Sequence, residues 1–438
     1  MTCFVRRSHE AVLDLRHFDL RRFVLVVLCH LHLSLLTALD PRTYSRQQQR
    51  HRGWGGTVTG EKQNPKAELN EISRSPSLCH KEKMDWLEMG KELSFRKLAE
   101  GSDCPEHLKY SFNIKGELRH LDTNEPFVFN YYKNAHENNH KRYQMLGYLI
   151  EQYVYQLLER ACKLQRVHLP IDATENEPRS FFFMSEKALT NPSSLVVLLQ
   201  DRGVFRAGQW GQKTIIHEGL EHGTQIPFIQ MALHDYGGVI VLNPNDNFID
   251  MKMEEERLSF LTKGESLSNS QSMGQIPKRC SSSPEEHTIY VWDHFISSKS
   301  LAKNVAFIAH GYGGLVFINL LMQRKWEVMS KVYSVAFIDS MHHTQHQVGS
   351  NPEMQEWIQK HCREWVTNSK HLDRPTGSLV KVDCPKVSAG TEKYTLAPSY
   401  SLQAIFKYLK STLKAKNVVA SPRSPIKTRS TSSKRCSK

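Results

Sequence analysis

Residues 305–315 have the pattern of a catalytic turn. Their sequence, VAFIAHGYGGL, takes an apolar run into a cluster of small residues that opens a second apolar run. Such a strand-to-helix turn is the setting of the G-x-S-x-G nucleophile elbow, in which a serine hydroxyl is presented for attack on a carbonyl carbon. With Ala309 as the first small residue and Gly313 as the last, the nucleophile position is Gly311. Because glycine carries no nucleophile, the pattern predicts the turn of a serine hydrolase without its chemistry.

The same turn has a second interpretation, as a phosphate-binding loop. That loop requires a lysine followed by serine or threonine directly after its glycines, whereas Leu315 and Val316 occupy those positions here. We therefore favour the elbow. Its strained backbone costs most residues about 1 to 3 kcal/mol, and glycine adopts it almost freely. Loss of the serine would thus leave the turn intact.

A working hydrolase also needs an oxyanion hole. One amide comes from the residue after the nucleophile, and another comes from a loop that follows an earlier strand. Gln200 and Asp201 follow the apolar run 195–199 and stand where that loop is expected. Asp201 would place a negative charge beside a developing oxyanion, which Arg202 could partly offset. We therefore expect no working oxyanion hole in this loop.

The acid candidates are Asp339 and Asp383. Asp339 follows the apolar run 332–338, at a strand end where α/β folds present functional groups, although it could equally cap the next helix. His342 and His346 would share a helix face, but a metal site needs at least one more ligand. We favour an ordinary surface or core role for both histidines, and the sequence predicts no metal or cofactor site.

Alternating apolar runs and helical segments surround these residues. Near-continuous apolar runs are typical of strands buried on both faces of a parallel sheet, and they predict strands at 179–184, 195–199, 239–242, 305–309 and 332–338, with a short sixth strand at 387–389. Helical spacing predicts helices at 141–164, 225–235, 286–297, 314–325, 352–369 and 400–414. Residues 112–121 and 127–131 are predicted to form a hairpin. This alternation predicts an α/β fold, with a doubly wound, mostly parallel sheet of the α/β-hydrolase type.

The chain divides into three predicted parts. Residues 102–413 form the α/β domain, with an exposed insertion rich in Ser, Lys and Glu at about 252–283. Residues 1–101 are an N-terminal extension that contains an apolar segment, 23–36, and a polar linker. Residues 414–438 are a basic tail. Both ends are predicted to be disordered because their composition is polar and aperiodic.

Composition favours an intracellular protein with an anionic partner. The nine cysteines form no C-x-x-C pair, which indicates reduced thiols in a cytosolic or nuclear protein. The net charge is +13, and residues 407–438 hold ten basic residues and no acidic one, so the tail could contact nucleic acid. The segment 23–36 resembles a secretory signal. A secreted or membrane-tethered protein is therefore the alternative, although the segment is too short to span a bilayer comfortably.

Seven further motifs give the chain a family resemblance. They are GELRH at 116–120, EPFVFNY at 125–131, RAGQW at 206–210, GTQIPF at 223–228, SPEEH at 283–287, VWDHF at 291–295 and DCP at 383–385. These motifs resemble the vertebrate cotranscriptional regulator family, whose members carry an Argonaute-binding-protein-two domain, an α/β-hydrolase-like module. The resemblance covers residues 102–413 and implies a diverged paralogue.

The resemblance implies a degenerate catalytic site. The family pattern at the elbow is Ala-His-Ser-Tyr-Gly-Gly, and Gly311 stands where the serine belongs. Gln200 and Asp201 replace the family's His-Gly in the oxyanion loop, and Tyr394 occupies the family's histidine position. Asp339 matches the family's Asp-Ser-x-His and could be a retained acid. Loss of one triad member already costs orders of magnitude in rate.

These observations predict a non-catalytic α/β-hydrolase-like binding protein. The family implies roles in small-RNA-linked silencing, heterochromatin formation and splicing, in the nucleus and also in the cytoplasm. The implied partners are an Argonaute-type protein and small RNA, and membrane contact is not expected. A residual serine hydrolase is the remaining alternative, but it needs another nucleophile, and neither Ser340 nor Ser388 lies on a recognisable elbow.

Overall fold

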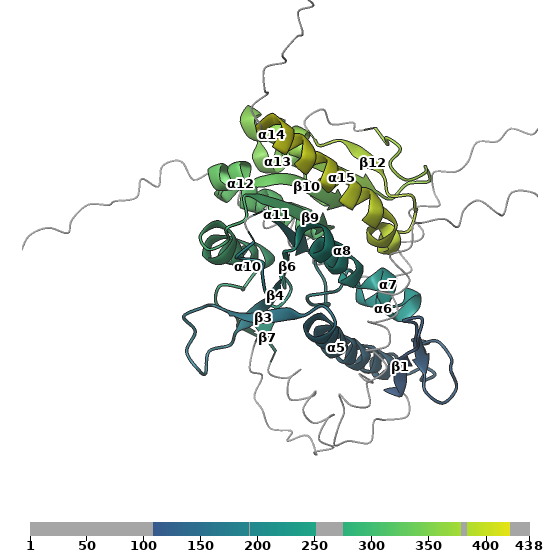
Figure 1. The fold of residues 1–438 in the computed structure, drawn as a ribbon. Coiled ribbons are helices and arrows are strands. Elements are labelled where there is room, and N and C mark those ends of the chain that lie inside the picture. Colours follow the sequence, from purple (N-terminus) through teal and green to yellow (C-terminus); the bar gives the residue numbers. More distant parts are fainter. Residues whose placement is uncertain (1–107, 192, 251–274, 378–382, 421–438) are drawn as a thin grey trace, which may run out of the picture. The chain divides into compact units, whose positions relative to one another are not determined.

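The computed structural model describes residues 108–191, 193–250, 275–377 and 383–420 (Figure 1). The predicted extension 1–101, with its apolar segment, lies outside the described residues, as do most of the insertion and the end of the tail. Among the helices that the structure describes, none combines the length and the apolar character needed to cross a membrane.

An eight-stranded sheet forms the centre of the domain. In spatial order, its strands are β12 (Lys386–Ser388), β11 (Cys362–Val366), β10 (Val332–Ile338), β9 (Asn304–His310), β5 (Ser194–Leu199), β6 (Val239–Val241), β4 (Ser180–Ser185) and β3 (Leu164–Leu169). The six strands from β12 to β6 are parallel, whereas β4 is antiparallel to both β6 and β3. The predicted mostly parallel α/β sheet is confirmed, and the six predicted strands agree with the structure within one residue at each end.

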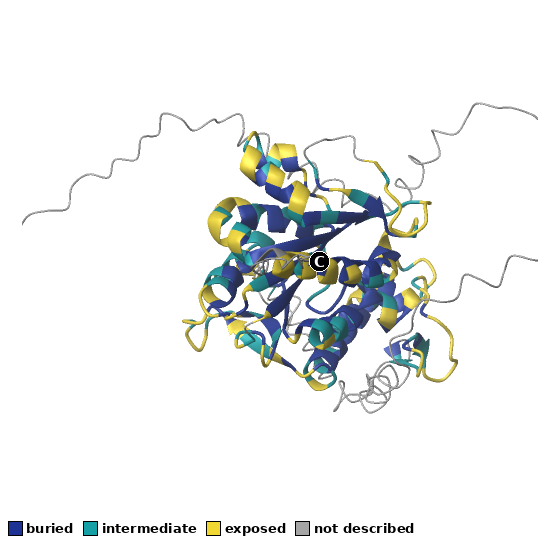
Figure 2. Ribbon diagram, turned by 45° about the horizontal axis from the view of Figure 1, so that its top comes forward, coloured by how far each residue is buried: buried dark blue, intermediate teal, exposed yellow. Residues whose placement is uncertain are grey.

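Helices cover both faces of the sheet. One hydrophobic core involves α5 (His136–Arg160), α6 (Gln212–Glu218), α7 (Leu220–Gly223), α8 (Ile226–Tyr236) and α15 (Ala397–Ala420). The other involves α10 (Pro284–Val291), the π-helix η4 (Trp292–Ser297), α11 (Tyr312–Gln323), α12 (Lys325–Lys331), α13 (Thr344–Val348) and α14 (Pro352–His361). Figure 2 shows buried strands between helices whose outer surfaces are exposed.

Burial on both faces explains why the sequence of strand β5 is apolar throughout. Successive side chains of a strand point to opposite faces. Val196 and Leu198 belong to the first core, whereas Leu195 and Val197 belong to the second. Because both faces are covered, every position of the strand is buried.

The helix predicted at 352–369 is wrong in its second half. Helix α14 ends at His361, and the next five residues form β11 between β10 and β12. A buried strand is expected to be apolar, but β11 contains Glu364, which is only 1% exposed. Its Oε1 accepts a hydrogen bond from Ser340 N at 3.0 Å, and its Oε2 lies 2.8 Å from Lys386 Nζ. The ion pair with Lys386 allows a glutamate to be buried in this strand. Because the strand contains this charged residue, the apolar pattern of the sequence did not predict it.

Two predictions near the N-terminal end of the domain are also corrected. Helix α5 ends at Arg160, and Leu164 begins the edge strand β3, which was not predicted. The hairpin is formed by β1 (Tyr110–Phe112) and β2 (Leu118–His120), and residues 127–131 form no strand. That segment is instead held by Arg142, which donates to Val128 O at 2.8 Å and lies over the Phe127 ring at 4.3 Å.

The end of the insertion and the start of the tail are ordered. Strand β7 (Phe248–Ile249) pairs with β8 (Ile276–Pro277), and Ser281, which we placed in the exposed insertion, is fully buried. Helix α15 continues to Ala420, so residues 414–420 are helical and not part of a disordered tail.

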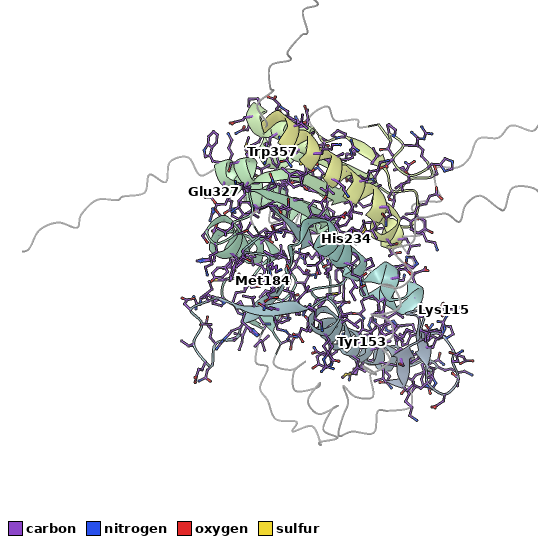
Figure 3. All side chains as sticks on the ribbon, in the orientation of Figure 1. Lys115, Tyr153, Met184, His234, Glu327 and Trp357 are labelled. Carbon is purple, nitrogen blue, oxygen red and sulfur yellow. The ribbon has the colours of Figure 1, made fainter. Side chains whose placement is uncertain are left out.

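The predicted helix at 286–297 is present as α10 followed by the π-helix η4. Ser283 caps it by accepting a hydrogen bond from Glu286 N at 3.1 Å. Glu327 of α12, labelled in Figure 3, accepts from Trp292 Nε1 at 3.2 Å and from Ser297 Oγ at 2.7 Å. These bonds hold η4 against α12. Helix α10 therefore has a fixed position beside the start of α11.

Candidate degenerate active site

Gly311 lies at the bend between β9 and α11. Its φ of 54° and ψ of −120° fall in a region that side-chain-bearing residues rarely adopt. The bend is held by backbone hydrogen bonds from Gly311 N to Ile338 O at 3.0 Å and from Met341 N to Gly311 O at 2.9 Å. The amide of Tyr312, the next residue, is left at the first turn of α11, where helical N–H groups have no intrahelical acceptor.

The space beside Gly311 is already occupied. A Cβ added to Gly311 would lie 2.3 Å from Asp201 Oδ1 and 2.4 Å from the Tyr394 hydroxyl oxygen. In an elbow with a serine, this is the position from which the hydroxyl acts. The chain therefore fills the nucleophile's place with the side chains of two residues that are distant in sequence.

Asp201 takes the place of the oxyanion. Its Oδ1 accepts hydrogen bonds from Tyr312 N at 2.6 Å and Arg202 N at 2.8 Å, and its Oδ2 accepts from the Tyr394 hydroxyl at 2.6 Å. Tyr312 N is the amide that directly follows the elbow position, which in hydrolases serves the oxyanion hole. An anion is also favoured at the N-terminus of α11. We expected Asp201 to repel an oxyanion from nearby, but its carboxylate occupies the position itself.

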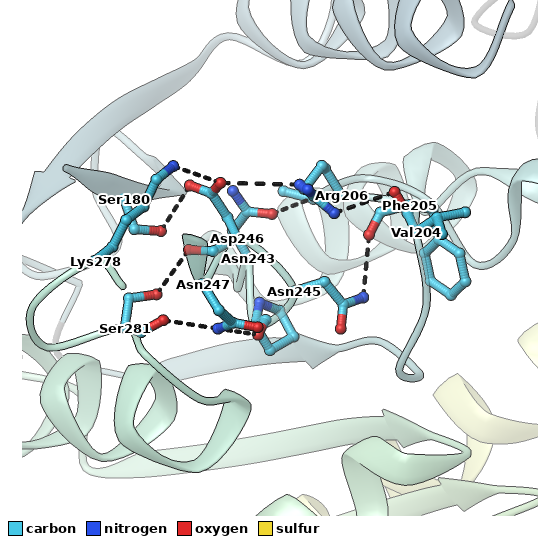
Figure 4. Close-up of polar contacts among 12 residues, drawn as sticks. Ser180, Val204, Phe205, Arg206, Asn243, Asn245, Asp246, Asn247, Lys278 and Ser281 are labelled. Carbon is cyan, nitrogen blue, oxygen red and sulfur yellow. Dashed lines mark hydrogen bonds and ion pairs between the residues drawn. The ribbon is translucent and has the colours of Figure 1, made fainter. Parts of the chain in front are cut away.

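A polar network holds the loop that carries Asp201. Asn245 Nδ2 donates to Asp201 O at 2.9 Å and to Phe205 O at 3.0 Å, and Gln200 Nε2 donates to Phe205 O at 3.3 Å. Asn243 Oδ1 accepts from the backbone of the same loop at 2.9 Å. Both asparagines follow β6 in the chain, and Figure 4 shows the hydrogen bond from Asn245 to Phe205.

The same network is anchored by Asp246. Its carboxylate lies 2.6 Å from Lys278 Nζ and 3.8 Å from Arg206 Nε, and it accepts from Ser180 Oγ at 2.9 Å (Figure 4). Both cationic side chains are largely buried, where ion pairs are weakly screened by solvent. Charged and amide side chains thus support the loop that carries Asp201. The position of Asp201 therefore does not depend only on the hydrogen bonds of its own carboxylate.

Tyr394 begins the 3-10 turn η5 (Tyr394–Leu396), after β12. It is 41% exposed, and its ring lies 4.9 Å from the ring of His310. A triad histidine would accept a proton from the nucleophile. The phenol of Tyr394 instead donates a hydrogen bond to Asp201 Oδ2, so this side chain does not serve as a base in the described arrangement.

His310, the last residue of β9, was not singled out from the sequence. It is 2% exposed, and neither ring nitrogen has a hydrogen-bond partner among the described residues. Burial lowers the pKa of His310 to about 4, although the nearby Asp201 charge opposes that shift. The ring is therefore neutral near pH 7. Its place in the AHGYGG turn was the signal available in the sequence.

Asp339 makes no hydrogen bond to a histidine in the described part of the chain. Its Oδ1 accepts from Thr367 N at 2.7 Å and from Thr367 Oγ1 at 3.1 Å, and its own N–H donates to Trp365 O at 2.8 Å. Burial raises the pKa of Asp339 above its ordinary value. The helix-cap alternative is wrong, because His343 is the N-cap of α13. Asp339 ties the end of β10 to the end of β11.

Two serine–histidine contacts have the proton on the wrong atom for catalysis. Ser281 Oγ lies 2.9 Å from His287 Nδ1, but His287 Nε2 accepts from a backbone N–H at 3.1 Å, so the neutral ring carries its proton on Nδ1. Ser399 Oγ lies 3.1 Å from His222 Nδ1. Because its single hydroxyl hydrogen is donated to the Leu396 carbonyl at 3.1 Å, we infer that Oγ accepts from the ring. In both pairs histidine is the donor, and it cannot remove the serine proton.

The third contact joins Ser340 and His342. Ser340 Oγ lies 2.7 Å from His342 Nδ1, but His342 Nε2 has no hydrogen-bond partner among the described residues. A catalytic pair needs a third group that orients the histidine. Ser340 also follows β10, away from an elbow, and its Oγ lies against Gly314. Ser388 donates to a backbone carbonyl at 2.7 Å. Neither serine replaces the missing nucleophile.

Comparison with known proteins assigns the chain to a family. The Arb2 domain model matches residues 102–372. The chain belongs to the Arb2 domain family. It is 58% identical over 360 residues to a human protein named ARB2BP, with 79% of this chain and 99% of that protein covered. It is 44% identical over 348 residues to the human cotranscriptional regulator ARB2A, with 73% of this chain and 83% of that protein covered.

Comparison with solved structures gives a distant likeness. The match is to a histone deacetylase from Saccharomyces cerevisiae, with 15% sequence identity and a TM-score of 0.39. The aligned region covers 62% of this chain and 97% of the deacetylase chain. The family resemblance predicted from the seven motifs is confirmed by the sequence comparisons. The matched range includes Asp201 and Gly311 and ends before Tyr394.

Proposed function

We propose that this Arb2 domain protein is a non-catalytic binding protein, a pseudoenzyme of the α/β-hydrolase type. One observation carries the proposal: the Asp201 carboxylate and the Tyr394 hydroxyl occupy the space beside Gly311 where a nucleophile would act. An acyl substrate would need the Tyr312 amide for its oxyanion, and Asp201 already accepts that hydrogen bond. The domain therefore acts through its surface.

The names of the relatives support a regulatory role. Similar proteins in human and mouse are called cotranscriptional regulators, and such proteins act where transcription takes place, in the nucleus. We extend this to an Argonaute-type partner, with small RNA, in silencing, heterochromatin formation or splicing. The ten basic residues of 407–438 would add a contact to nucleic acid through their charge.

Immunoprecipitation from nuclear extract tests the partner. With the full chain as bait, an Argonaute-type protein should co-purify in the presence of nuclease, because the contact is between proteins. A chain lacking residues 421–438 is the matched control and should retain the partner. Loss of the partner on nuclease treatment contradicts a protein contact. Loss of the partner when residues 421–438 are removed would show that the contact is made by the tail and not by the domain.

A fluorophosphonate probe tests the absence of catalysis. The purified full chain should remain unlabelled, whereas a working serine hydrolase reacts at its nucleophile. Labelling of any serine would contradict the proposal.

Localisation tests the secretory alternative. The full chain and a chain lacking residues 1–39 should both be nuclear. Transfer of the full chain alone into the secretory pathway would favour the secreted or membrane-tethered alternative.

A further inference from the structure

Three side chains with metal-binding atoms meet beyond the elbow. A ring nitrogen of His342, a carboxylate oxygen of Glu364 and Sγ of Cys384 lie within 4.8 Å of one another. The three residues are 7%, 1% and 0% exposed. They come from the loop after β10, from β11 and from the segment that leads into β12, which the parallel pairing sets side by side. Helical spacing in the sequence indicates His346 as a second ligand beside His342, and it does not reveal this cluster, whose residues come from three separate segments.

The ring of His342 is oriented for ligation. Ser340 Oγ lies 2.7 Å from Nδ1, and Phe337 stacks on the ring at 4.4 Å. Nε2 is left buried and without a hydrogen-bond partner among the described residues. A metal-bound histidine usually donates its other N–H to a neighbouring acceptor, and Ser340 Oγ is in place for that role. The unpartnered nitrogen is the atom that a cation would need.

The cluster holds more acceptors than cations. Lys386 Nζ lies 2.8 Å from Glu364 Oε2, and its ammonium supplies the positive charge that a bound ion would otherwise supply. Asp383, next to Cys384, has a buried Oδ1 with no hydrogen-bond partner in the described part of the chain. Its charge also acts on His342. Buried polar atoms are rarely left unpaired, and one divalent ion would satisfy several of these at once.

We propose that His342, Glu364 and Cys384 form a structural zinc site, with Asp383 as the candidate fourth ligand. Imidazole nitrogen, thiolate and carboxylate are the ligands that Zn²⁺ takes in proteins, and buried four-coordinate sites are structural. Ligand atoms around zinc lie about 3.3 to 3.8 Å apart, so on binding the separations among the three atoms, which are within 4.8 Å, would close by at most roughly 1 to 1.5 Å. Zinc would link β11 and β12 to the loop after β10, and Lys386 would move away from Glu364.

Cobalt titration of the full chain, stripped of metal, tests the site. One equivalent of Co²⁺ should give the charge-transfer absorption of a thiolate ligand, and Zn²⁺ should displace it and raise the Tm. Cys384→Ser should abolish the absorption and weaken Zn²⁺ binding by more than the roughly 10- to 100-fold that loss of an outer-shell partner causes. Cys362→Ser, a buried thiol outside the cluster, and Cys280→Ser, a partly exposed one, are matched controls that should retain both.

A second variant tests the site even if Cys384→Ser does not fold. Lys386→Met removes the ammonium that competes for Glu364, so its Tm should rise more on addition of Zn²⁺ than that of the unmodified chain. A site that is only a buried ion pair predicts no such rise. The proposal is overturned if the unmodified chain gives no thiolate absorption with Co²⁺, or if Cys384→Ser retains it.

Discussion

Substituting Gly311 by alanine tests directly whether Asp201 and Tyr394 fill the elbow. The added Cβ would lie 2.3 Å from Asp201 Oδ1 and 2.4 Å from the Tyr394 hydroxyl oxygen, so the carboxylate must leave its bonds to Tyr312 N, Arg202 N and the phenol. Because the loop is partly exposed and water replaces some of each bond, we take about 1 kcal/mol for each of the three. The strained backbone adds about 1 to 3 kcal/mol. The expected loss in free energy of unfolding is about 4 to 6 kcal/mol.

Gly349 provides a control for backbone strain alone. Its φ of 62° and ψ of −141° resemble the 54° and −120° of Gly311, and apart from its two chain neighbours no described residue has an atom within 4 Å of an added Cβ. Gly349→Ala should therefore cost only the strain of about 1 to 3 kcal/mol. The difference between the two alanine variants measures the displacement of Asp201 and Tyr394.

A mutant cycle separates that displacement from other effects. In the background Asp201→Gly/Tyr394→Phe, the two oxygen atoms that meet the added Cβ are absent. The cost of Gly311→Ala should fall to that of Gly349→Ala, which corresponds to a coupling of about 3 kcal/mol. Urea unfolding followed by circular dichroism measures all four chains. An equal cost of Gly311→Ala in both backgrounds would refute the reasoning, because the carboxylate and hydroxyl would then not occupy that space.

Three further predictions concern activity, pH and the loop. Gly311→Ser alone should show no turnover of an aryl ester. The added Cβ would displace the Asp201 carboxylate, but Tyr394 would still stand in the histidine position and could not take the serine proton as a base; measurable turnover would contradict this. Burial lowers the pKa of His287 and His310 to about 4, below the ordinary 6.5, so the unfolded chain binds more protons and stability falls as pH drops from about 6.5 to about 4. Between pH 7 and pH 5 we expect the free energy of unfolding to fall by about 2 kcal/mol for each histidine. Urea unfolding of His287→Gln should show a fall that is smaller by the contribution of one histidine. An unchanged pH dependence in this variant would contradict the prediction. Asn245→Ala should destabilise the chain by about 1 to 3 kcal/mol and speed amide hydrogen exchange in the loop it holds, whereas exchange that stays slow would show that the network is not needed.

The central strands were predictable because burial on both faces leaves an uninterrupted apolar run in the sequence. In β5 and β9, helices cover both faces of the sheet, so apolar residues follow one another without interruption. The same rule missed β11, whose Glu364 is buried through partners on two other segments, Ser340 and Lys386. It also missed the edge strand β3, in which only the two end residues, Leu164 and Leu169, are buried and Gln165 is exposed.

The sequence by itself determined the elbow and its missing nucleophile. A strand, a tight turn and a helix are built from neighbouring residues, so steric and backbone preferences within residues 305–315 were enough to identify position 311. Tertiary structure alone decided what fills that position. The bonds from Tyr312 and Tyr394 to Asp201 join residues 111 and 193 positions apart. Such contacts depend on how the fold brings β5, β9 and the end of the chain together. The spacing of residues in the sequence does not predict that arrangement.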